Sequence, residues 1–284
     1  MRNSTEAVRR LGGWSVLTAI LLTAEPPNRL TAQQVFPNRA TAYLFPTDVR
    51  DARAIWVNPA GLGVQREAST YMEVAVGDPG AQGRLRQVNA GFNARGLSFG
   101  YQRDMLDDGQ RSHTYRLGLA GGSGGLAAGF DVTRYRGDGA KATGWDFGAT
   151  YVAHAGLNLG LVIANIGQPN VRGLPQRLTY IPGATWHPSR LPAFGVSTYA
   201  RITPDWVEWY AFGVTWRTLA RRPMEIIARM DTDRGFRRGA FVLGFSIGGE
   251  NRVGAVVSTP GDVSRIDDAS VYGLATREPA TRRR

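Results

Sequence analysis

The sequence predicts an all-β fold: a transmembrane antiparallel β-barrel of about fourteen strands, with a short N-terminal segment that plugs or caps it. Three observations predict this fold. The N-terminus has the pattern of a secretory signal, no later segment stays apolar for the length of a transmembrane helix, and alternating segments fill the remainder. A bilayer admits only helices and closed barrels, because each unpaired backbone group in hydrocarbon costs several kcal/mol.

The N-terminal residues predict export. Arginines precede an uncharged, largely apolar stretch over residues 11–24, and small residues follow it. The stretch is shorter than the roughly 20 residues that a transmembrane helix needs. We therefore expect a cleavable signal peptide over residues 1–32, with cleavage near Ala32 or, alternatively, near Ala24. The absence of cysteine suits an oxidising destination.

From about residue 69 the sequence alternates with a period of two. In residues 145–151 the odd positions are Trp145, Phe147, Ala149 and Tyr151, and the positions between them are polar or small. One such face suits lipid and the other suits water. The same parity occurs at Val88/Ala90/Phe92, Leu97/Phe99/Tyr101, Tyr115/Leu117/Leu119, Ala128/Phe130/Val132, Leu157/Leu159/Leu161/Ile163, Phe194/Val196, Tyr210/Phe212/Val214/Trp216, Phe241/Leu243/Phe245/Ile247 and Val253/Ala255/Val257.

Weaker segments bring the count to about fourteen, an even number as bacterial barrels require. They are residues 71–76, 178–186, 224–231 and 271–275. Turn signals such as Asp107-Asp108-Gly109 and Gly249-Glu250-Asn251 separate the segments. The predicted organisation is a signal peptide over 1–32, a plug or cap segment over 33–68, a barrel over 69–276 and a basic tail over 277–284.

Glycines recur on the face opposite the aromatic residues. One interpretation, which we favour, is that they relieve crowding where the sheet curves; the other is that they let a plug or ligand approach the wall. The glycines are Gly91, Gly100, Gly118, Gly129, Gly148, Gly160, Gly195, Gly213, Gly244, Gly254 and Gly273.

A soluble β-sandwich or propeller would also alternate and turn at this spacing. Aromatic residues near segment ends favour the membrane barrel, because they suit interfacial girdles. The net charge of +11 comes from scattered arginines, which codon usage explains, although some arginines could line the lumen or bind lipid phosphates. Scattered arginines without a recognition helix argue against nucleic-acid binding.

No catalytic or metal-binding pattern is evident. The histidines are His113, His154 and His187, each near the end of an expected strand and without a hydrolase, zincin or phosphate-loop motif. We therefore expect neither an enzyme nor a cofactor or metal site.

Two short motifs resemble a known superfamily. The first is Asn58-Pro59-Ala60-Gly61-Leu62, and the second combines Asn165 and Gly167 at a strand end with Leu174-Pro175 at a strand opening. They resemble motifs of the barrel superfamily of long-chain fatty-acid transporters (FadL-like) and PorV/PorQ proteins. The resemblance implies a fourteen-stranded outer-membrane barrel whose N-terminal segment enters or caps the lumen. It also implies passage of hydrophobic molecules in the transporter branch and type IX secretion in the PorV/PorQ branch.

We accordingly expect a bacterial outer-membrane barrel that handles a hydrophobic solute or an exported cargo. The alternative is a non-conducting docking or structural barrel of a secretion system. Expected partners are outer-membrane lipid and either a hydrophobic small molecule or a secreted protein, but no nucleic acid. The inward polar residues Asn93, Arg116, Asp131, Asp146 and Asn158 are expected to line the lumen.

Overall fold

The computed structural model describes residues 37–64, 67–80, 83–106, 109–137, 139–153, 156–171 and 173–277. The expected signal peptide, both candidate cleavage positions, His154 and the tail beyond residue 277 lie outside these residues.

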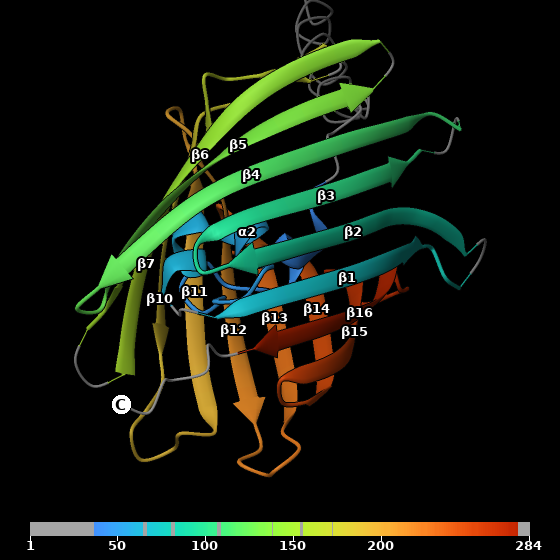
Figure 1. Ribbon diagram of the computed structural model, residues 1–284. Coiled ribbons are helices and arrows are strands. Elements are labelled where there is room, and N and C mark those ends of the chain that lie inside the picture. The colour runs from blue at the N-terminus through green and yellow to red at the C-terminus, as the bar shows by residue number, and fades with distance from the viewer. Residues whose placement is uncertain are drawn as a thin grey trace, which may run out of the picture. The chain divides into compact units, whose positions relative to one another are not determined.

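The described strands form one closed antiparallel barrel of fourteen strands, in which β1 pairs with β16 and each other neighbour pair is also antiparallel (Figure 1). The predicted fold class is therefore confirmed. The strands are β1 (Ala68–Gly77), β2 (Arg84–Ala94), β3 (Leu97–Met105), β4 (Arg111–Ser123), β5 (Leu126–Gly137), β6 (Ala140–Val152), β7 (Leu157–Ile166), β10 (Thr179–Trp186), β11 (Phe194–Ile202), β12 (Val207–Arg217), β13 (Met224–Asp233), β14 (Arg238–Gly248), β15 (Asn251–Pro260) and β16 (Asp268–Arg277).

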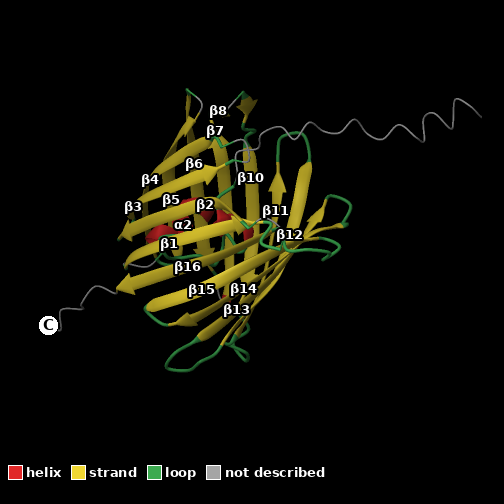
Figure 2. Cartoon of the chain, turned by 90° about the vertical axis from the view of Figure 1, so that its right-hand side faces the viewer, coloured by secondary structure: helices red, strands yellow, loops and turns green. Residues whose placement is uncertain are grey.

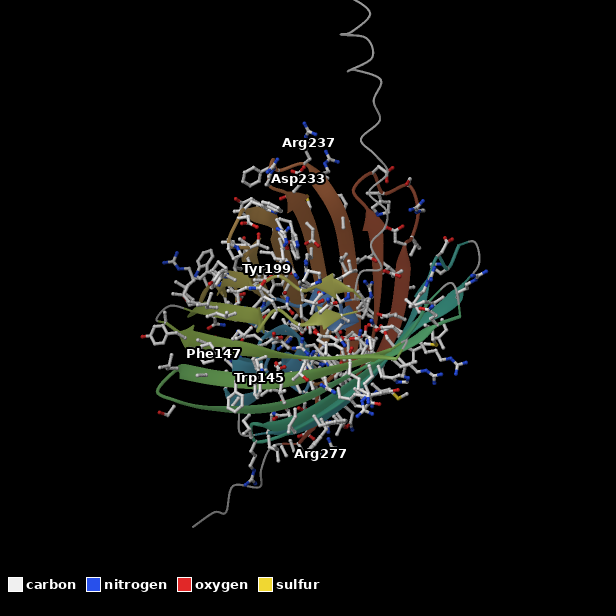
Figure 3. All side chains as sticks on the ribbon, turned by 90° about the horizontal axis from the view of Figure 1, so that it is seen from above. Trp145, Phe147, Tyr199, Asp233, Arg237 and Arg277 are labelled. Atoms are coloured by element: carbon white, nitrogen blue, oxygen red, sulfur yellow. The ribbon has the colours of Figure 1, made fainter. Side chains whose placement is uncertain are left out.

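Alternation along the strands separates an apolar outer face from a polar inner face. In β5 the side chain of Phe130 is 46% exposed whereas that of the next residue, Asp131, is fully buried. Trp145 and Phe147 lie on the outer face of β6, and Tyr199 of β11 points into the barrel (Figure 3). One glycine departs from the expected face: Gly273 lies between the buried residues Tyr272 and Leu274, so it faces outward.

The two ends of the barrel differ in their connections. We call the end at which β1 begins and β16 ends the proximal end, and the opposite end the distal end. Three proximal connections, 95–96, 124–125 and 249–250, have only two residues each. The distal connections include 261–267 and the long connection 167–178. The proximal connections 187–193 and 218–223 are longer, and the distal connection 138–139 is as short as the three, but the longest connection, 167–178, is distal.

The connection 167–178 contains its own small ladder, in which β8 (Asn170–Val171) pairs with β9 (Leu174–Pro175). The second motif led us to expect that Leu174 and Pro175 open a barrel strand. They do not, because β10 begins only at Thr179. The reason is local, because the backbone of Val171 pairs with that of Leu174 and closes a short turn before the chain reaches the wall. Asn165 and Gly167 do mark the end of β7, and both have positive φ angles.

Residues 37–64, which we call the plug segment, lie inside the barrel (Figure 2). Three short helices form it: η1 (Arg39–Ala42), α2 (Ala54–Val57) and η2 (Pro59–Gly63). Asn38 and Asn58 cap η1 and η2, because each side-chain oxygen accepts the backbone N–H two residues later. The apolar side chains of the plug segment, including Ile55 and Leu62, form the core together with inward residues of the wall.

Candidate functional site: the plugged lumen

The motif 58–62 fixes the plug segment both to itself and to the wall. Asn58 is fully buried, and its Oδ1 accepts the N–H of Ala60 at 3.1 Å. Its Nδ2 donates to the carbonyl of Pro46 at 2.8 Å and to that of Ala149 in β6 at 3.4 Å. Ala60 and Leu62 are also fully buried, and a Cβ on Gly61 would collide with the carbonyl oxygen of Val49. The motif is therefore a docking element and not only the end of a helix.

Glycines of the wall make room for the plug segment. A Cβ added to Gly148 would overlap Asn58 Oδ1, and one added to Gly100 would lie 2.7 Å from a ring carbon of Trp56. Plug atoms come similarly close to Gly129, Gly160 and Gly213. Close approach of the plug, the interpretation that we favoured less, explains these positions directly.

The expected lumen residues Arg116, Asp131 and Asp146 form one buried ion cluster on β4, β5 and β6. Arg116 Nη1 lies 3.2 Å from Asp131 Oδ2 and 2.8 Å from Asp146 Oδ2. The same nitrogen donates to the plug carbonyl of Ile55 at 3.0 Å, and the guanidinium lies 5.3 Å from the ring centroid of Trp56. The cluster therefore joins three strands to α2.

The two remaining lumen candidates have different surroundings. Asn93 is fully buried, donates to the carbonyl of Leu62 at 3.3 Å, and accepts the N–H of Gly96 at 3.0 Å. Asn158 of β7 is buried, with 3% of its surface exposed. Among the family-motif residues, Asn165 donates its backbone N–H to Asp146 at 2.7 Å, so the end of β7 is coupled to the ion cluster.

A second polar network near the distal end was not singled out from the sequence. Asn38 Nδ2 donates to Asn89 Oδ1 and to Gln102 Oε1, both at 3.0 Å. Gln87 accepts the N–H of Arg39 at 2.9 Å and donates to Asp104 at 2.8 Å. These wall residues share the inward parity of the strand glycines, so the alternation pattern was a signal that could have identified them.

Arg229, midway along β13, binds the first part of the plug segment, around η1. Its Nη1 donates to the carbonyl of Thr41 at 2.7 Å, and its Nε donates to Asp231 at 2.7 Å. The guanidinium also lies 5.0 Å from the ring centroid of Tyr199 and 5.8 Å from that of Phe45. An arginine paired and stacked in this way is fixed in position.

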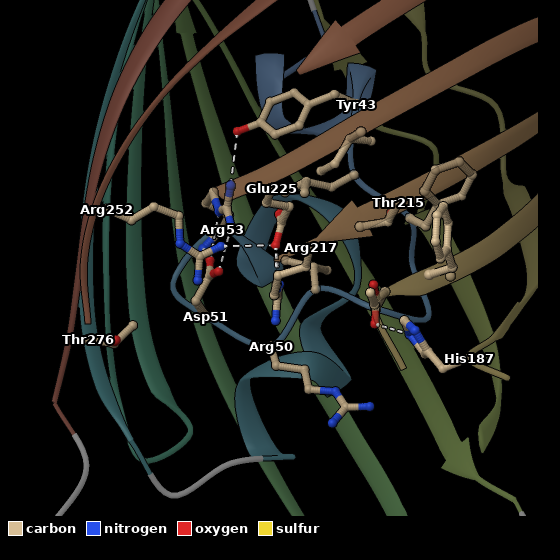
Figure 4. A pocket seen from close by; sticks show the side chains of 18 of the residues that line it. Tyr43, Arg50, Asp51, Arg53, His187, Thr215, Arg217, Glu225, Arg252 and Thr276 are labelled. Atoms are coloured by element: carbon tan, nitrogen blue, oxygen red, sulfur yellow. Dashed lines mark hydrogen bonds and ion pairs between the residues drawn. The ribbon is translucent and has the colours of Figure 1, made fainter. Parts of the chain in front are cut away.

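A cavity of about 340 Å³ lies between the plug segment and the proximal parts of β11, β12, β13, β15 and β16 (Figure 4). One part of its lining is apolar, with Leu44, Phe45 and Ile227. The other part is charged, with Arg50, Asp51, Arg53, Arg217, Glu225 and Arg252. Arg217 is paired with Glu225, and Arg252 Nη1 lies 3.6 Å from the same carboxylate. The cavity is therefore amphipathic.

His187 and Asp48 line the same cavity and join wall to plug. The His187 Nε2 atom lies 3.1 Å from Asp48 Oδ1. The hydrogen bond to Asp48 raises the pKa of His187 above its ordinary value. Burial alone would raise the pKa of Asp48, but the hydrogen bond and charge of His187 outweigh burial and lower it.

Within the part of the chain that the structure describes, no helix is both long and apolar enough to cross a membrane. No group of three or more histidine, cysteine or carboxylate side chains is placed to hold a metal ion among these same residues. The fold and the lumen together define a closed antiparallel barrel that is filled by its own N-terminal segment.

No family model matches the sequence, and no curated protein matches it. Solved structures are similar at low identity. A FadL homologue of Pseudomonas aeruginosa is 11% identical with a TM-score of 0.45, covering 82% of this chain and 94% of that one. The toluene transporter TodX of Pseudomonas putida is 9% identical with a TM-score of 0.48, covering 82% and 97%. The outer membrane protein Omp33 of Acinetobacter baumannii is 8% identical with a TM-score of 0.46, covering 76% and 100%.

Proposed function

We propose that this chain is an outer-membrane β-barrel of the fatty-acid-transporter or PorV/PorQ type, which handles a hydrophobic solute or an exported cargo behind a closed plug. The apolar outer face supports a membrane location: on β14, Leu243 is 52% exposed, Phe245 40% and Ile247 43%. Large apolar side chains on a sheet without an edge match what lipid requires. The proposal assigns no enzymatic activity, cofactor or nucleic-acid partner.

The short connections indicate the orientation. Bacterial barrels place short turns on the periplasmic side and longer loops outside the cell. The proximal end, with three two-residue connections, is therefore proposed to face the periplasm. The cavity would then lie in the periplasmic half of the lumen.

The amphipathic cavity is the observation that carries the solute proposal. Its volume of about 340 Å³ falls within the range of small-molecule sites. Phe45 and Ile227 supply apolar surface. Arg50 extends away from the paired charges around Glu225 (Figure 4). A solute with an apolar body and a single anionic head group would use both parts of the lining.

The alternative, a non-conducting docking barrel, is favoured by how firmly the plug segment is held. Buried side chains bond it at the distal end through Asn38, in the middle through Arg229 and nearer the proximal end through Asn58. Such firm attachment suits a barrel whose plug segment never has to move. The two functions differ in flux, so they are separable by experiment.

Purified barrel in liposomes tests the proposal directly. Uptake of a fluorescent long-chain fatty acid, together with solute-driven swelling, should exceed that of empty liposomes, and deletion of residues 33–63 should increase the leak. Wild-type flux equal to empty liposomes, combined with co-purification of secretion components, would favour the docking barrel. Unchanged leak after the deletion would show that residues 33–63 do not close the pore. Heat-modified gel mobility controls for correct folding of both proteins.

A further inference from the structure

The outer face of β3 to β6 changes character in successive rows toward the distal end. The register pairs residues directly across the strands, so each row is a set of immediate neighbours. The first row is Phe99, Leu117, Val132 and Trp145; the second is Tyr101, Tyr115, Arg134 and Thr143; the third is Arg103, His113, Arg136 and Lys141. We call the third set the basic row. It contains Lys141, the one lysine in the sequence.

The acidic side chains of these same strands lie on the opposite face of the sheet from the basic row. Asp104, Asp131 and Asp146 point into the lumen, with exposed fractions of 1%, 0% and 6%. By contrast, Arg136 and Lys141 are exposed and are direct cross-strand partners. The acidic residues of the adjoining distal connections, Asp107, Asp108 and Asp138, lie outside the described residues.

Side-by-side cations are unfavourable on a sheet unless something compensates for them. Adjacent strands lie about 4.8 Å apart, well inside the screening length of about 8 Å at physiological salt. Like charges in directly opposed positions destabilise a sheet. Part of the compensation is internal, because the Arg136 guanidinium lies 5.9 Å from the ring centroid of Tyr115. The geometry leaves the outward side of the row available to anions.

The rows place these cations beyond the tyrosines along the strands. The rings of Tyr101 and Tyr115 pack at a tilt of 45° with 5.4 Å between their centroids, and the Tyr101 hydroxyl lies 2.9 Å from His113 Nδ1. Tyrosines between an apolar band and a polar rim are typical of the membrane interface. The basic row lies two residues further along each strand, about 7 Å beyond the tyrosines. Side chains beyond interfacial tyrosines face the head-group region of a bilayer.

We infer that the basic row binds the phosphate groups of membrane lipid head groups in the leaflet at the distal end. The inference rests on the proposed membrane location. Guanidinium groups bind phosphate oxygens through paired hydrogen bonds, and each cation near an anionic lipid surface adds to the attraction. Three neighbouring non-histidine cations, Arg103, Arg136 and Lys141, match a lipid that carries more than one phosphate.

A lipid titration of the full barrel tests this inference. The barrel in non-ionic micelles is titrated with lipid A, which carries two phosphates, and separately with zwitterionic phosphatidylcholine. We compare wild type with a triple variant, Arg103→Gln, Arg136→Gln and Lys141→Gln. A matched control, Arg190→Gln, Arg221→Gln and Arg222→Gln, removes the same charge from exposed positions in proximal connections.

Lipid A should bind wild type more tightly than phosphatidylcholine, and the basic-row variant should bind it about 100-fold more weakly. The control should stay within about twofold of wild type, because its charges are at the other end. If both triple variants lost the same affinity for lipid A, net charge alone would explain the effect, and the inference would be overturned. Equal affinity of the wild type for lipid A and for phosphatidylcholine would also overturn the inference.

Insertion into phosphatidylcholine vesicles is scored separately, by heat-modified mobility and protease protection. Failure to insert would count against the membrane location itself, whereas insertion without lipid discrimination would reject only the basic-row inference. If the triple variant does not fold, wild-type affinity is measured against rising salt. Because salt screens attraction between charges, an affinity for lipid A that does not change with salt would also overturn the basic-row inference.

Discussion

His187 and Asp48 form a bond between the wall and the plug, with 3.1 Å between Nε2 and Oδ1. His187 lies in the proximal connection 187–193, and Asp48 lies in the loop between η1 and α2. Each side chain contacts the cavity. The pair therefore connects the protonation state of one histidine to how firmly the plug segment is held at the proximal end.

The attachment should depend on pH in a direction set by both pKa shifts. The raised pKa of His187 gives a contribution that is complete below about pH 6.5 and is lost as the pH rises through the raised value. The lowered pKa of Asp48 gives a contribution that is present above about pH 4 and is lost as the pH falls through the lowered value. Attachment should therefore be strongest in mildly acidic solution.

The side chains of His187 and Asp48 are 34% and 30% exposed, so the effect on unfolding free energy should stay below about 1 kcal/mol. The pH dependence of the attachment is measured by the hydrogen exchange of the backbone amides around Asp48 at a series of pH values. The variant His187→Gln should remove the pH dependence, and His113→Gln, on the outer face, should leave it intact. Identical profiles in wild type and His187→Gln would refute the connection.

Replacing Asn58 should weaken the barrel through the plug. The variant Asn58→Ala loses the cap of η2 and leaves the carbonyls of Pro46 and Ala149 without this donor. We expect a loss of about 2–4 kcal/mol in unfolding free energy, measured by urea denaturation in detergent. The control Asn170→Ala, at an exposed position, should change it by less than about 0.5 kcal/mol. Equal stability of the two variants would contradict the docking role of the motif.

Adding a methyl group to the wall should displace the plug at one glycine and not at another. Gly148→Ala introduces a Cβ that overlaps Asn58 Oδ1, whereas Gly244→Ala meets its nearest atom at 3.6 Å. The first should cost about 1–3 kcal/mol and increase solute leak, while the second should do neither. Liposome swelling by the two variants checks this pair. Equal leak from both would mean that close plug contact at Gly148 does not matter for closure.

The ion cluster should be sensitive to removal of its one cation. Arg116→Met leaves Asp131 and Asp146 buried beside each other and should destabilise the barrel by about 3–5 kcal/mol. Adding Asp131→Asn and Asp146→Asn to that variant should restore much of the loss, because no buried charge then remains unpaired. The temperature of the heat-modified gel transition reports both effects. Failure of the neutral triple variant to recover would show that Arg116 acts mainly through its contact with the carbonyl of Ile55.

Some features of the site followed from the alternation of side chains in the sequence, while others depended on how the strands pair with one another. The inward parity of Arg116, Asp131 and Asp146 was readable from the sequence, but their convergence on α2 was not. The place of Leu174 and Pro175 was predicted incorrectly because a two-residue ladder has no periodicity to detect. Gly273 was assigned to the wrong face because the aromatic residue beside it, Tyr272, points inward and stacks on Tyr43 of the plug segment. Its registered partner Met72 is 57% exposed, in agreement with an outward Gly273.

What the sequence determined by itself is the alternation of apolar and polar side chains. In a membrane this alternation requires a closed sheet with an apolar exterior, because backbone groups cannot remain unpaired in lipid. What only the tertiary structure decided is which plug atom meets which wall residue. Asn58 and Ala149 are separated by 91 positions, and Asn38 and Gln102 by 64. Such contacts depend on the register of strands far apart in the chain, and a local pattern carries no information about that register.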